Sequence, residues 1–152
     1  MATERTLILC KGDAVVRGLV GEVLSRFERR GYQIIALKIL QVEEARAKKH
    51  YAEHEGKPFF PGLIQYITGS PIVAVVIEGS DAIKGCRATI GATNPIEAGP
   101  GTIRGDYAQT IGRNLVHGSD SPASAQREIA IWFEPNELFS RPSENASWLV
   151  GD

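Results

Sequence analysis

The sequence lacks the features that would point to a membrane or to a highly charged partner. Its longest apolar run, Ile72–Ile77, is far shorter than the roughly 20 residues that a membrane-spanning helix needs. The net charge is −1, with 17 basic and 18 acidic residues, so the overall charge gives no signal for nucleic acid or for an anionic membrane surface. Any anion site must therefore depend on where individual Lys and Arg residues lie.

Cysteine is also scarce. Cys10 and Cys86 are the only two, and without CxxC or metal-type spacing we expect reduced thiols rather than a disulfide or a metal site. The segment Met1–Arg5 has no apolar stretch of the kind found in secretion signals. These features predict a cytoplasmic protein. The length of 152 residues suits one domain, 1–152, with a sizeable core.

Several common ligand motifs are missing. There is no Walker A motif, no kinase glycine loop and no Rossmann fingerprint, so side chains and loop amides would have to hold any phosphate. His50 and His54 are four residues apart but lack the Glu of a zincin motif. We interpret both as surface histidines and expect no metal ligands from the protein.

The apolar pattern predicts an α+β fold. Strands are expected at 6–10, 32–40 and 72–77, with a short one at 114–117. Helices are expected from Val16 to a stop at Gly31, over 43–53, around 63–67, after Ser80 as N-cap, and after Ser121 as N-cap. This order predicts a ferredoxin-like βαββαβ core with an antiparallel four-stranded sheet, extra helices, a long loop and an irregular C-terminal tail.

The residues with the most chemical potential lie between Gly91 and Ser121. The segment 91–114 is rich in Gly, Thr, Asn and Pro, and a loop of that length is usually functional. Asn114–Ser121 (NLVHGSDS) follows, with His117 at its centre. A neutral imidazole can accept a phosphoryl group and release it again. Arginine suits phosphate because its guanidinium forks onto the oxygens. The candidate cations at chain breaks are Lys11, Arg87, Arg104 and Arg113.

These residues resemble the nucleoside diphosphate kinase family. NLVHGSDS is similar to the active-site signature of that family, and the similarity extends almost from end to end. The other matching segments are 4–9, 17–22, 50–54, 57–60, 91–95, 100–106 and 128–133.

The resemblance implies ping-pong transfer of the γ-phosphate from a nucleoside triphosphate, usually ATP, to a nucleoside diphosphate through phospho-His117. It implies that Glu128 orients the imidazole and that Tyr51 and Ser119 line the site. Lys11 would contact the ribose 3′-hydroxyl and the transferred phosphate. The implied nucleotide-binding residues are Lys11 and Asn114 at the ribose, Phe59 and Ile111 at the base, and Arg87, Thr93 and Arg104 at the phosphates.

The resemblance also implies Mg²⁺, carried on the nucleotide phosphates without a dedicated protein ligand. The implied partners are ATP and other nucleoside di- and triphosphates, with no stable nucleic acid partner and no membrane. A homo-oligomer is implied, and we prefer a hexamer over a tetramer because the loop around Pro95 and Pro100 and the tail after Glu134 are long enough for its contacts. Arg113 does not match a principal phosphate ligand, so we expect a structural ion pair there.

The chain departs from the family pattern at three places. The usual Lys-Pro-Asp after the first strand is Lys11–Asp13 with Gly12 in the middle, and the usual Ser-Gly-Pro before the third strand is Gly69-Ser70-Pro71. Ile77 replaces an aromatic residue. Glycine is more mobile than proline, so Lys11 is expected to be less firmly placed. No chemical group is removed, and activity is expected.

Two other hypotheses remain open from the residues. One is a non-catalytic ferredoxin-like module that binds nucleotide or RNA, although the sequence lacks RNP-like motifs and a positive net charge. The other is a different phosphohistidine enzyme, such as a phosphatase. That enzyme would need an acid for the leaving group and access for water, and no second histidine lies in a matching motif.

Overall fold

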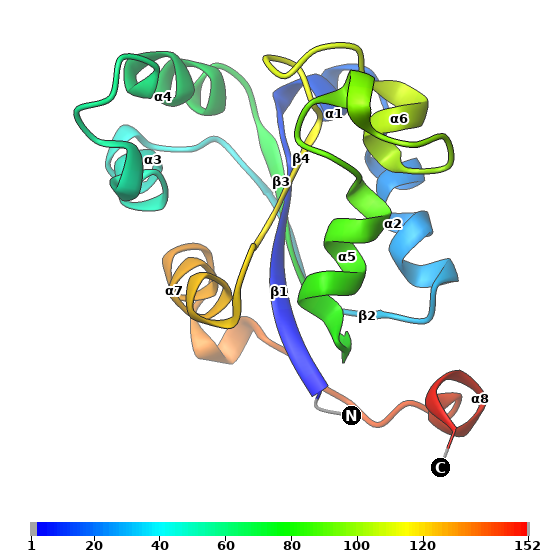
Figure 1. Cartoon of the computed structure of the whole chain (residues 1–152). Coiled ribbons are helices and arrows are strands. Elements are labelled where there is room, and N and C mark those ends of the chain that lie inside the picture. Colours follow the sequence, from blue (N-terminus) through cyan, green and yellow to red (C-terminus); the bar gives the residue numbers. More distant parts are fainter. Residues whose placement is uncertain (1–2, 152) are drawn as a thin grey trace.

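The computed structural model describes residues 3–151. Its centre is a four-stranded antiparallel sheet with the order β2-β3-β1-β4 (Figure 1). The strands are β1 (Thr3–Cys10), β2 (Gln33–Leu40), β3 (Ile72–Ser80) and β4 (Val116–Gly118). The two central strands carry continuous buried stretches because helices cover both of their faces. The predicted ferredoxin-like sheet is confirmed.

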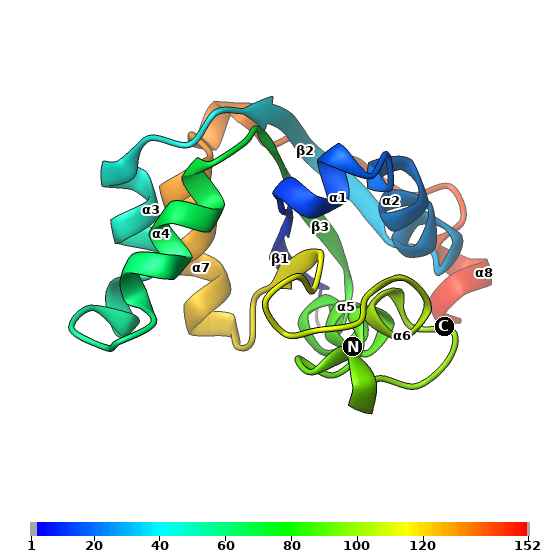
Figure 2. The same cartoon turned by 90° about the horizontal axis from the view of Figure 1, so that it is seen from above.

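Helices lie on both sides of this sheet. Seen from above, α3, α4 and α7 lie on one side and α2, α5 and α6 on the other (Figure 2). The helices are α1 (Gly12–Val16), α2 (Val20–Arg29), α3 (Glu44–His50), α4 (Phe60–Thr68), α5 (Ala82–Ile90), α6 (Ile103–Tyr107), α7 (Pro122–Trp132) and α8 (Ala146–Val150). Short 3-10 turns occur at Ala52–His54, Pro95–Glu97 and Pro135–Glu137.

Each face of the sheet has its own core. The side of α7 buries a group that includes Leu7, Leu9, Ile67, Val76 and Trp132. The side of α2 and α5 buries a group that includes Ile8, Val23, Phe27, Val75 and Cys86. Neighbouring residues of β1 alternate between the two groups because successive side chains of a strand point to opposite faces.

The first helical segment begins earlier than predicted and is divided in two. The apolar spacing predicts one helix from Val16, but the chain forms α1 and α2 with a break between them. Gly18 has a φ of 70°, a conformation that glycine adopts without steric cost, and it ends α1. Val16 is 78% exposed and lies outside the buried stripe. The predicted stop at Gly31 agrees with its φ of 99°.

The prediction of helix caps is confirmed at one position and wrong at another. Ser121 caps α7 as predicted, with its Oγ accepting from the Ser124 N–H at 3.1 Å. Ser80 does not cap α5, because β3 extends through it and Asp81 takes the N-cap position. The long loop and the tail also contain the short helices α6 and α8, which the composition did not predict.

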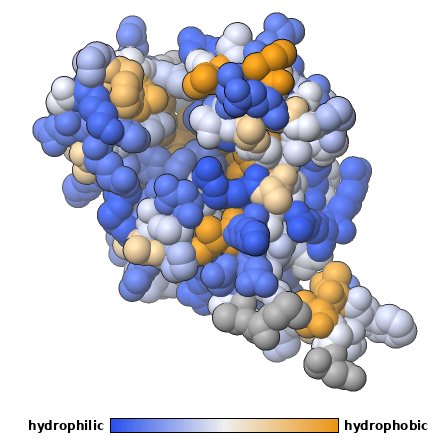
Figure 3. Space-filling model, in the orientation of Figure 1, coloured by the Kyte–Doolittle hydropathy of each residue, from blue (hydrophilic) through white to orange (hydrophobic). Residues whose placement is uncertain are grey.

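The exposed apolar side chains of the tail lie at the C-terminal end of the chain. Trp148, Leu149 and Val150 belong to α8, and Figure 3 shows apolar surface over that helix at the lower right. Within residues 3–151, no helix is long and apolar enough to cross a membrane.

Candidate active site

His117 lies in the middle of β4, directly opposite Leu9 of β1. Opposed residues of an antiparallel pair project from the same face, and Leu9 belongs to the core on the α7 side. The imidazole therefore faces α7, while Val116 packs into the core on the other face. The His117 side chain is 24% exposed, so it is supported by protein and still open to solvent.

Glu128 of α7 holds the imidazole. Its Oε1 lies 2.8 Å from His117 Nε2 and accepts a hydrogen bond from Ser119 Oγ at 2.7 Å. Burial raises the pKa of the Glu128 carboxyl, but the hydrogen bonds from His117 and Ser119 outweigh it and the pKa is lowered overall. An ionised carboxylate accepts only, so His117 Nε2 carries the proton and Nδ1 keeps its lone pair.

Ser119 connects this pair to the sheet. Its hydroxyl accepts from the Leu7 N–H at 3.2 Å while it donates to Glu128. Ser119 is fully buried, so both partners satisfy a polar group that would otherwise be costly to bury. The predicted neighbours Glu128 and Ser119 are thus in contact with each other, and Glu128 is in contact with His117.

His50 corrects the prediction of a surface histidine. It is buried, and its Nδ1 accepts a hydrogen bond from Trp132 Nε1 at 3.1 Å. Its ring stands edge-on to His117, with 4.7 Å between centroids. Burial, and next the nearby His117, lower the pKa of His50 to about 3. The helical spacing of His50 with buried Ala47 was the signal available in the sequence. His54 is half-buried.

A series of aromatic rings leads from His50 to the edge of the site. The centroid distances are 4.7 Å from His50 to Tyr51, 6.3 Å from Tyr51 to His54 and 5.3 Å from His54 to Phe59. Burial, with a smaller contribution from Glu128, raises the pKa of Tyr51 to about 12, so its hydroxyl stays protonated. Phe59 is 52% exposed and offers an open ring at the surface.

Lys11 and Asn114 lie at the adjoining ends of β1 and β4. Lys11 Nζ donates to Asn114 Oδ1 at 2.5 Å, and Asn114 Nδ2 donates to the Thr93 carbonyl at 3.1 Å. Burial and then the positive charge of Arg104 lower the pKa of Lys11 to about 8, although Asp13 opposes the shift. Lys11, Thr93 and Asn114 thus form one connected group.

Two arginines bind the backbone on either side of His117. Arg104 Nη2 donates to the Val116 carbonyl at 2.6 Å, and Arg87 Nη1 donates to the Gly118 carbonyl at 3.0 Å. Arg104 also donates to the Asn114 carbonyl at 3.2 Å and the Gly91 carbonyl at 3.1 Å. Burial, and then the charge of Arg87, lower the pKa of Arg104 to about 10. The sequence did not predict this bracing of β4.

Ile111 and Arg113 lie in the loop before Asn114. Ile111 is 56% exposed. The predicted ion pair of Arg113 is wrong, since no salt bridge in residues 3–151 includes it. Its guanidinium lies over the Tyr66 ring at 4.5 Å, a cation–π contact, and donates to the Gly112 carbonyl at 2.7 Å.

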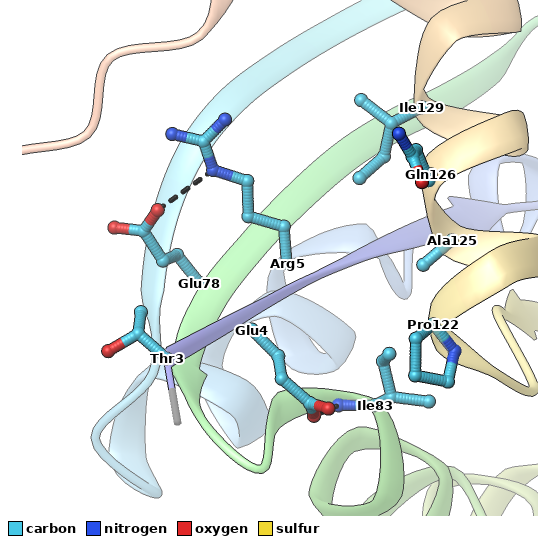
Figure 4. A pocket seen from close by; sticks show the side chains of 9 residues that line it. All are labelled: Thr3, Glu4, Arg5, Glu78, Ile83, Pro122, Ala125, Gln126 and Ile129. Atoms are coloured by element: carbon cyan, nitrogen blue, oxygen red, sulfur yellow. Dashed lines mark hydrogen bonds and ion pairs between the residues drawn. The ribbon is translucent and has the colours of Figure 1, made fainter. Parts of the chain in front are cut away.

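Two cavities lie elsewhere on the molecule. One of about 370 Å³ lies between the start of β1, α5 and α7 (Figure 4), and the Arg5–Glu78 ion pair of 2.9 Å spans part of its wall. Another of about 850 Å³ lies between the tail and the segments around Arg30 and Asp81. Neither is lined by a predicted site residue. The site is therefore defined by the side chains around His117.

One group of side chains has the spacing of a metal site. A ligand atom from each of His50, His117 and Glu128 lies within 4.8 Å of the others. Two imidazoles and a carboxylate suit zinc better than Mg²⁺, which prefers octahedral oxygen ligands. His50 Nδ1 and Glu128 Oε1 are already engaged in hydrogen bonds. The group does not fit a resident Mg²⁺.

Comparison with known proteins agrees with this geometry. The family model described as nucleoside diphosphate kinase matches residues 4–138. The chain is 57% identical to the nucleoside diphosphate kinase of Gloeobacter violaceus, over 96% of this chain and 98% of that protein. It is 52% identical to the one of Archaeoglobus fulgidus, over 96% and 97%.

Solved structures agree as well. The halophilic nucleoside diphosphate kinase of Halobacterium salinarum in complex with CDP superposes with a TM-score of 0.94 at 43% identity, covering 97% of this chain and 99% of that one. A nucleoside diphosphate kinase family protein from Babesia bovis gives 0.93 at 42% identity, covering 96% and 99%. These matches support the catalytic hypothesis over the binding-module alternative. The chain belongs to the nucleoside diphosphate kinase family.

Proposed function

We propose that this protein transfers the γ-phosphate of a nucleoside triphosphate to a nucleoside diphosphate through a phosphohistidine at His117. The observation that carries the proposal is the 2.8 Å contact between His117 Nε2 and the carboxylate of Glu128. That contact places the proton on Nε2 and leaves Nδ1 as the nucleophile.

The transfer takes two steps that are the reverse of each other in form. In the first, Nδ1 forms a bond to the γ-phosphorus as the bond to the β–γ bridging oxygen breaks, and the nucleoside diphosphate leaves. In the second, a terminal β-phosphate oxygen of the acceptor attacks that phosphorus, and the N–P bond breaks. The Nε2 proton stays on the ring, and the Glu128 carboxylate offsets the positive charge that the imidazole gains.

The cations around β4 supply the charge that phosphoryl transfer needs. Lys11, Arg87 and Arg104 come from three separate parts of the chain and bond residues of 114–118, the segment that carries His117. Arg104 bonds three backbone carbonyls, and a guanidinium has more N–H donors than these use. Arg104 is only 6% exposed, and we expect its remaining donors to bind a phosphate.

The part of the site that would bind the nucleoside suits many bases rather than one. Phe59 and Ile111 are exposed apolar side chains and would enclose a base without reading its hydrogen-bonding edge. Lys11 and Asn114 would bind the ribose hydroxyls. The CDP bound to the relative from Halobacterium salinarum fits a nucleoside diphosphate as substrate here. We expect broad tolerance of the base.

Mg²⁺ enters with the nucleotide as part of the substrate, because the His50, His117 and Glu128 group does not fit it. When Mg²⁺ is bound to the nucleotide, it neutralises part of the phosphate charge. Titration of the protein with Mg²⁺ alone is expected to give no binding heat, and EDTA is expected to stop turnover.

The assay uses ATP labelled at the γ position, followed by GDP. Wild-type protein should become labelled with an acid-labile phosphate and then pass the label to GTP, and His117→Ala should do neither. Wild type that binds nucleotide without being labelled would be a binding module. Release of label as free phosphate in the absence of acceptor would indicate a phosphatase.

We also propose a homo-oligomer in the cytoplasm, with a hexamer preferred over a tetramer. β2 is an edge strand whose Leu37 and Ile39 are exposed, and Ile96 and Phe139 are exposed in the loop and tail. The two free, buried cysteines suit a reducing compartment. Native mass spectrometry measures the number of subunits, and a tetramer would contradict the preferred assembly.

A further inference from the structure

We propose that Ser70 is a positioning residue for Lys11 and that it acts through the space left by the missing side chain of Gly12. The inference rests on the proposed function only in that Lys11 serves phosphoryl transfer. A Cβ built on Gly12 would lie 2.2 Å from Ser70 Oγ, far inside van der Waals contact. The Ser70 hydroxyl therefore occupies the place where a side chain at position 12 would be.

Space, not backbone conformation, requires the glycine. Gly12 is the first residue of α1 and has no positive φ. Proline is well tolerated at the first position of a helix. Lys11 before it has φ −73° and ψ 175°, which is the extended conformation that a residue before proline adopts. The backbone would thus accept a side chain or a proline ring, but the Ser70 hydroxyl, which donates to the Pro71 carbonyl at 3.4 Å, would have to turn away to admit it.

The neighbours of Gly12 show why its position matters. The Lys11 N–H donates to the Leu115 carbonyl at 2.8 Å, and the Leu115 N–H donates to Asp13 Oδ2 at 3.0 Å. These bonds support Leu115 in its left-handed conformation, with φ 73°, two residues before His117. Movement of the segment 11–13 would therefore disturb Lys11 and the start of β4 together.

Tyr66 of α4 and Ser70, two residues after that helix ends, lie beside this segment. Lys11 Nζ lies 5.4 Å from the centroid of the Tyr66 ring, and the Tyr66 hydroxyl donates to Asp13 Oδ1. The Ser70 hydroxyl fills the space beside Gly12. Tyr66 and Ser70 thus lie on one side of the strand end, and Leu115 and Asn114 lie on the other.

The two departures from the family pattern then form one change. The pattern Lys-Pro-Asp places a ring at position 12, and Ser-Gly-Pro places no side chain at position 70. In this chain the side chain is absent at Gly12 and present at Ser70. The space that a proline ring at position 12 would fill is filled here by the Ser70 side chain. We therefore infer that Ser70 takes over the support of Lys11 from that ring.

The test is a double-mutant cycle with Gly12→Ala, Ser70→Ala and both together. Without the hydroxyl, the nearest remaining atom is Ser70 Cβ at 3.5 Å, which is ordinary contact. We expect Gly12→Ala to lower kcat on the order of 10- to 100-fold through displacement of Lys11. The double variant should recover to within about threefold of wild type, since the overlap is gone.

The pH profile separates positioning from a general loss of structure. Displacement of Lys11 should move the alkaline fall of kcat/KM in Gly12→Ala, and the double variant should move it back. Gly21→Ala is the matched control, because nothing lies within 4 Å of a Cβ at that glycine, and its profile should stay that of wild type. A Gly12→Ala variant with wild-type kcat and a wild-type pH profile would overturn the proposal. A double variant with a kcat no higher than that of Gly12→Ala would also overturn it.

A second readout keeps the inference independent of activity. The same four proteins are unfolded in urea, and a coupling free energy between positions 12 and 70 should appear whether or not the wild type transfers phosphate. If Gly12→Ala does not fold, Gly12→Pro combined with Ser70→Gly should fold and transfer phosphate, whereas Gly12→Pro alone should not. Coupling in an inactive wild type would mean that the proposed function fails while the steric pair stands. Additive effects in an active wild type would mean the reverse.

Discussion

Trp132 Nε1 donates a hydrogen bond to His50 Nδ1 at 3.1 Å, immediately beside the ring of His117. An indole can only donate, so His50 Nδ1 is an acceptor and its proton is on Nε2. With its pKa lowered to about 3 by burial and by the neighbouring His117, His50 stays neutral near pH 7. His117, the proposed nucleophile, therefore lies against an uncharged imidazole.

Replacement of His50 should distinguish this hydrogen bond from simple packing. His50→Leu leaves the Trp132 N–H unsatisfied and should lower the free energy of unfolding by about 1–3 kcal/mol. His50→Asn can accept from Trp132 and should lose less. Urea unfolding followed by fluorescence measures both, in a Trp148→Phe background that leaves Trp132 as the only tryptophan. Equal losses for the two variants would argue against the hydrogen bond.

Glu128→Gln should slow phosphorylation of His117 by about 10²- to 10⁴-fold, because the amide can present its N–H₂ to Nε2 and no longer fixes the tautomer. Rapid-quench measurement of the phosphoprotein gives the rate directly. Arg127→Gln is the neighbouring control. Arg127 is 3.7 Å from the other Glu128 oxygen and pairs with Glu53 at the surface, so its loss should change the rate little. A fast Glu128→Gln enzyme would contradict the assigned tautomer.

Arg104→Lys should destabilise the protein even without nucleotide. Lysine keeps the charge but cannot reach the three carbonyls that Arg104 binds, and we expect a loss of about 1–3 kcal/mol in urea unfolding. Arg87→Lys should lose less, since one carbonyl is involved. ADP affinity measured by calorimetry should fall in both variants if these arginines bind phosphate. Unchanged stability of Arg104→Lys would show that the bracing is unimportant.

Lys11 should make catalysis sensitive to alkaline pH. Its pKa is lowered to about 8 by burial and then by Arg104, so the positive charge is present below pH 8 and is lost as the pH rises through it. We expect kcat/KM, which reports the free enzyme, to fall above about pH 8. Lys11→Arg should abolish that fall, since arginine stays charged. A wild-type profile that is flat up to pH 10 would rule out the assignment.

Folding stability should respond to Lys11 with the opposite sign. Between pH 8 and 10.5 the unfolded chain binds more protons at this residue than the folded chain, so this residue's contribution to stability rises with pH across that window. Lys11→Met should flatten that rise in urea unfolding. The lowered pKa also means that the charged lysine destabilises the unliganded protein near pH 7, a cost that bound phosphate would offset.

The secondary structure was largely readable from local patterns. Alternating and continuous apolar runs indicated all four strands, and Ser121 with Pro122 marked the start of α7 correctly. The break between α1 and α2 does not follow from the apolar spacing, because Val16 has the spacing of the buried stripe and only the φ of Gly18 removes it. Ser80 has the chemistry of a helix cap, but it pairs with Thr3 in the sheet instead.

The residue types alone indicate the chemistry: one imidazole in NLVHGSDS, cations at chain breaks and a resemblance that implies their roles. Tertiary structure alone decided which partners tune those groups. Trp132 lies 82 residues from His50, and Ser70 lies 58 from Gly12, so no local pattern records either contact. Burial of His50 and exclusion of a side chain at Gly12 both depend on atoms that only the folded sheet and its helices bring within reach.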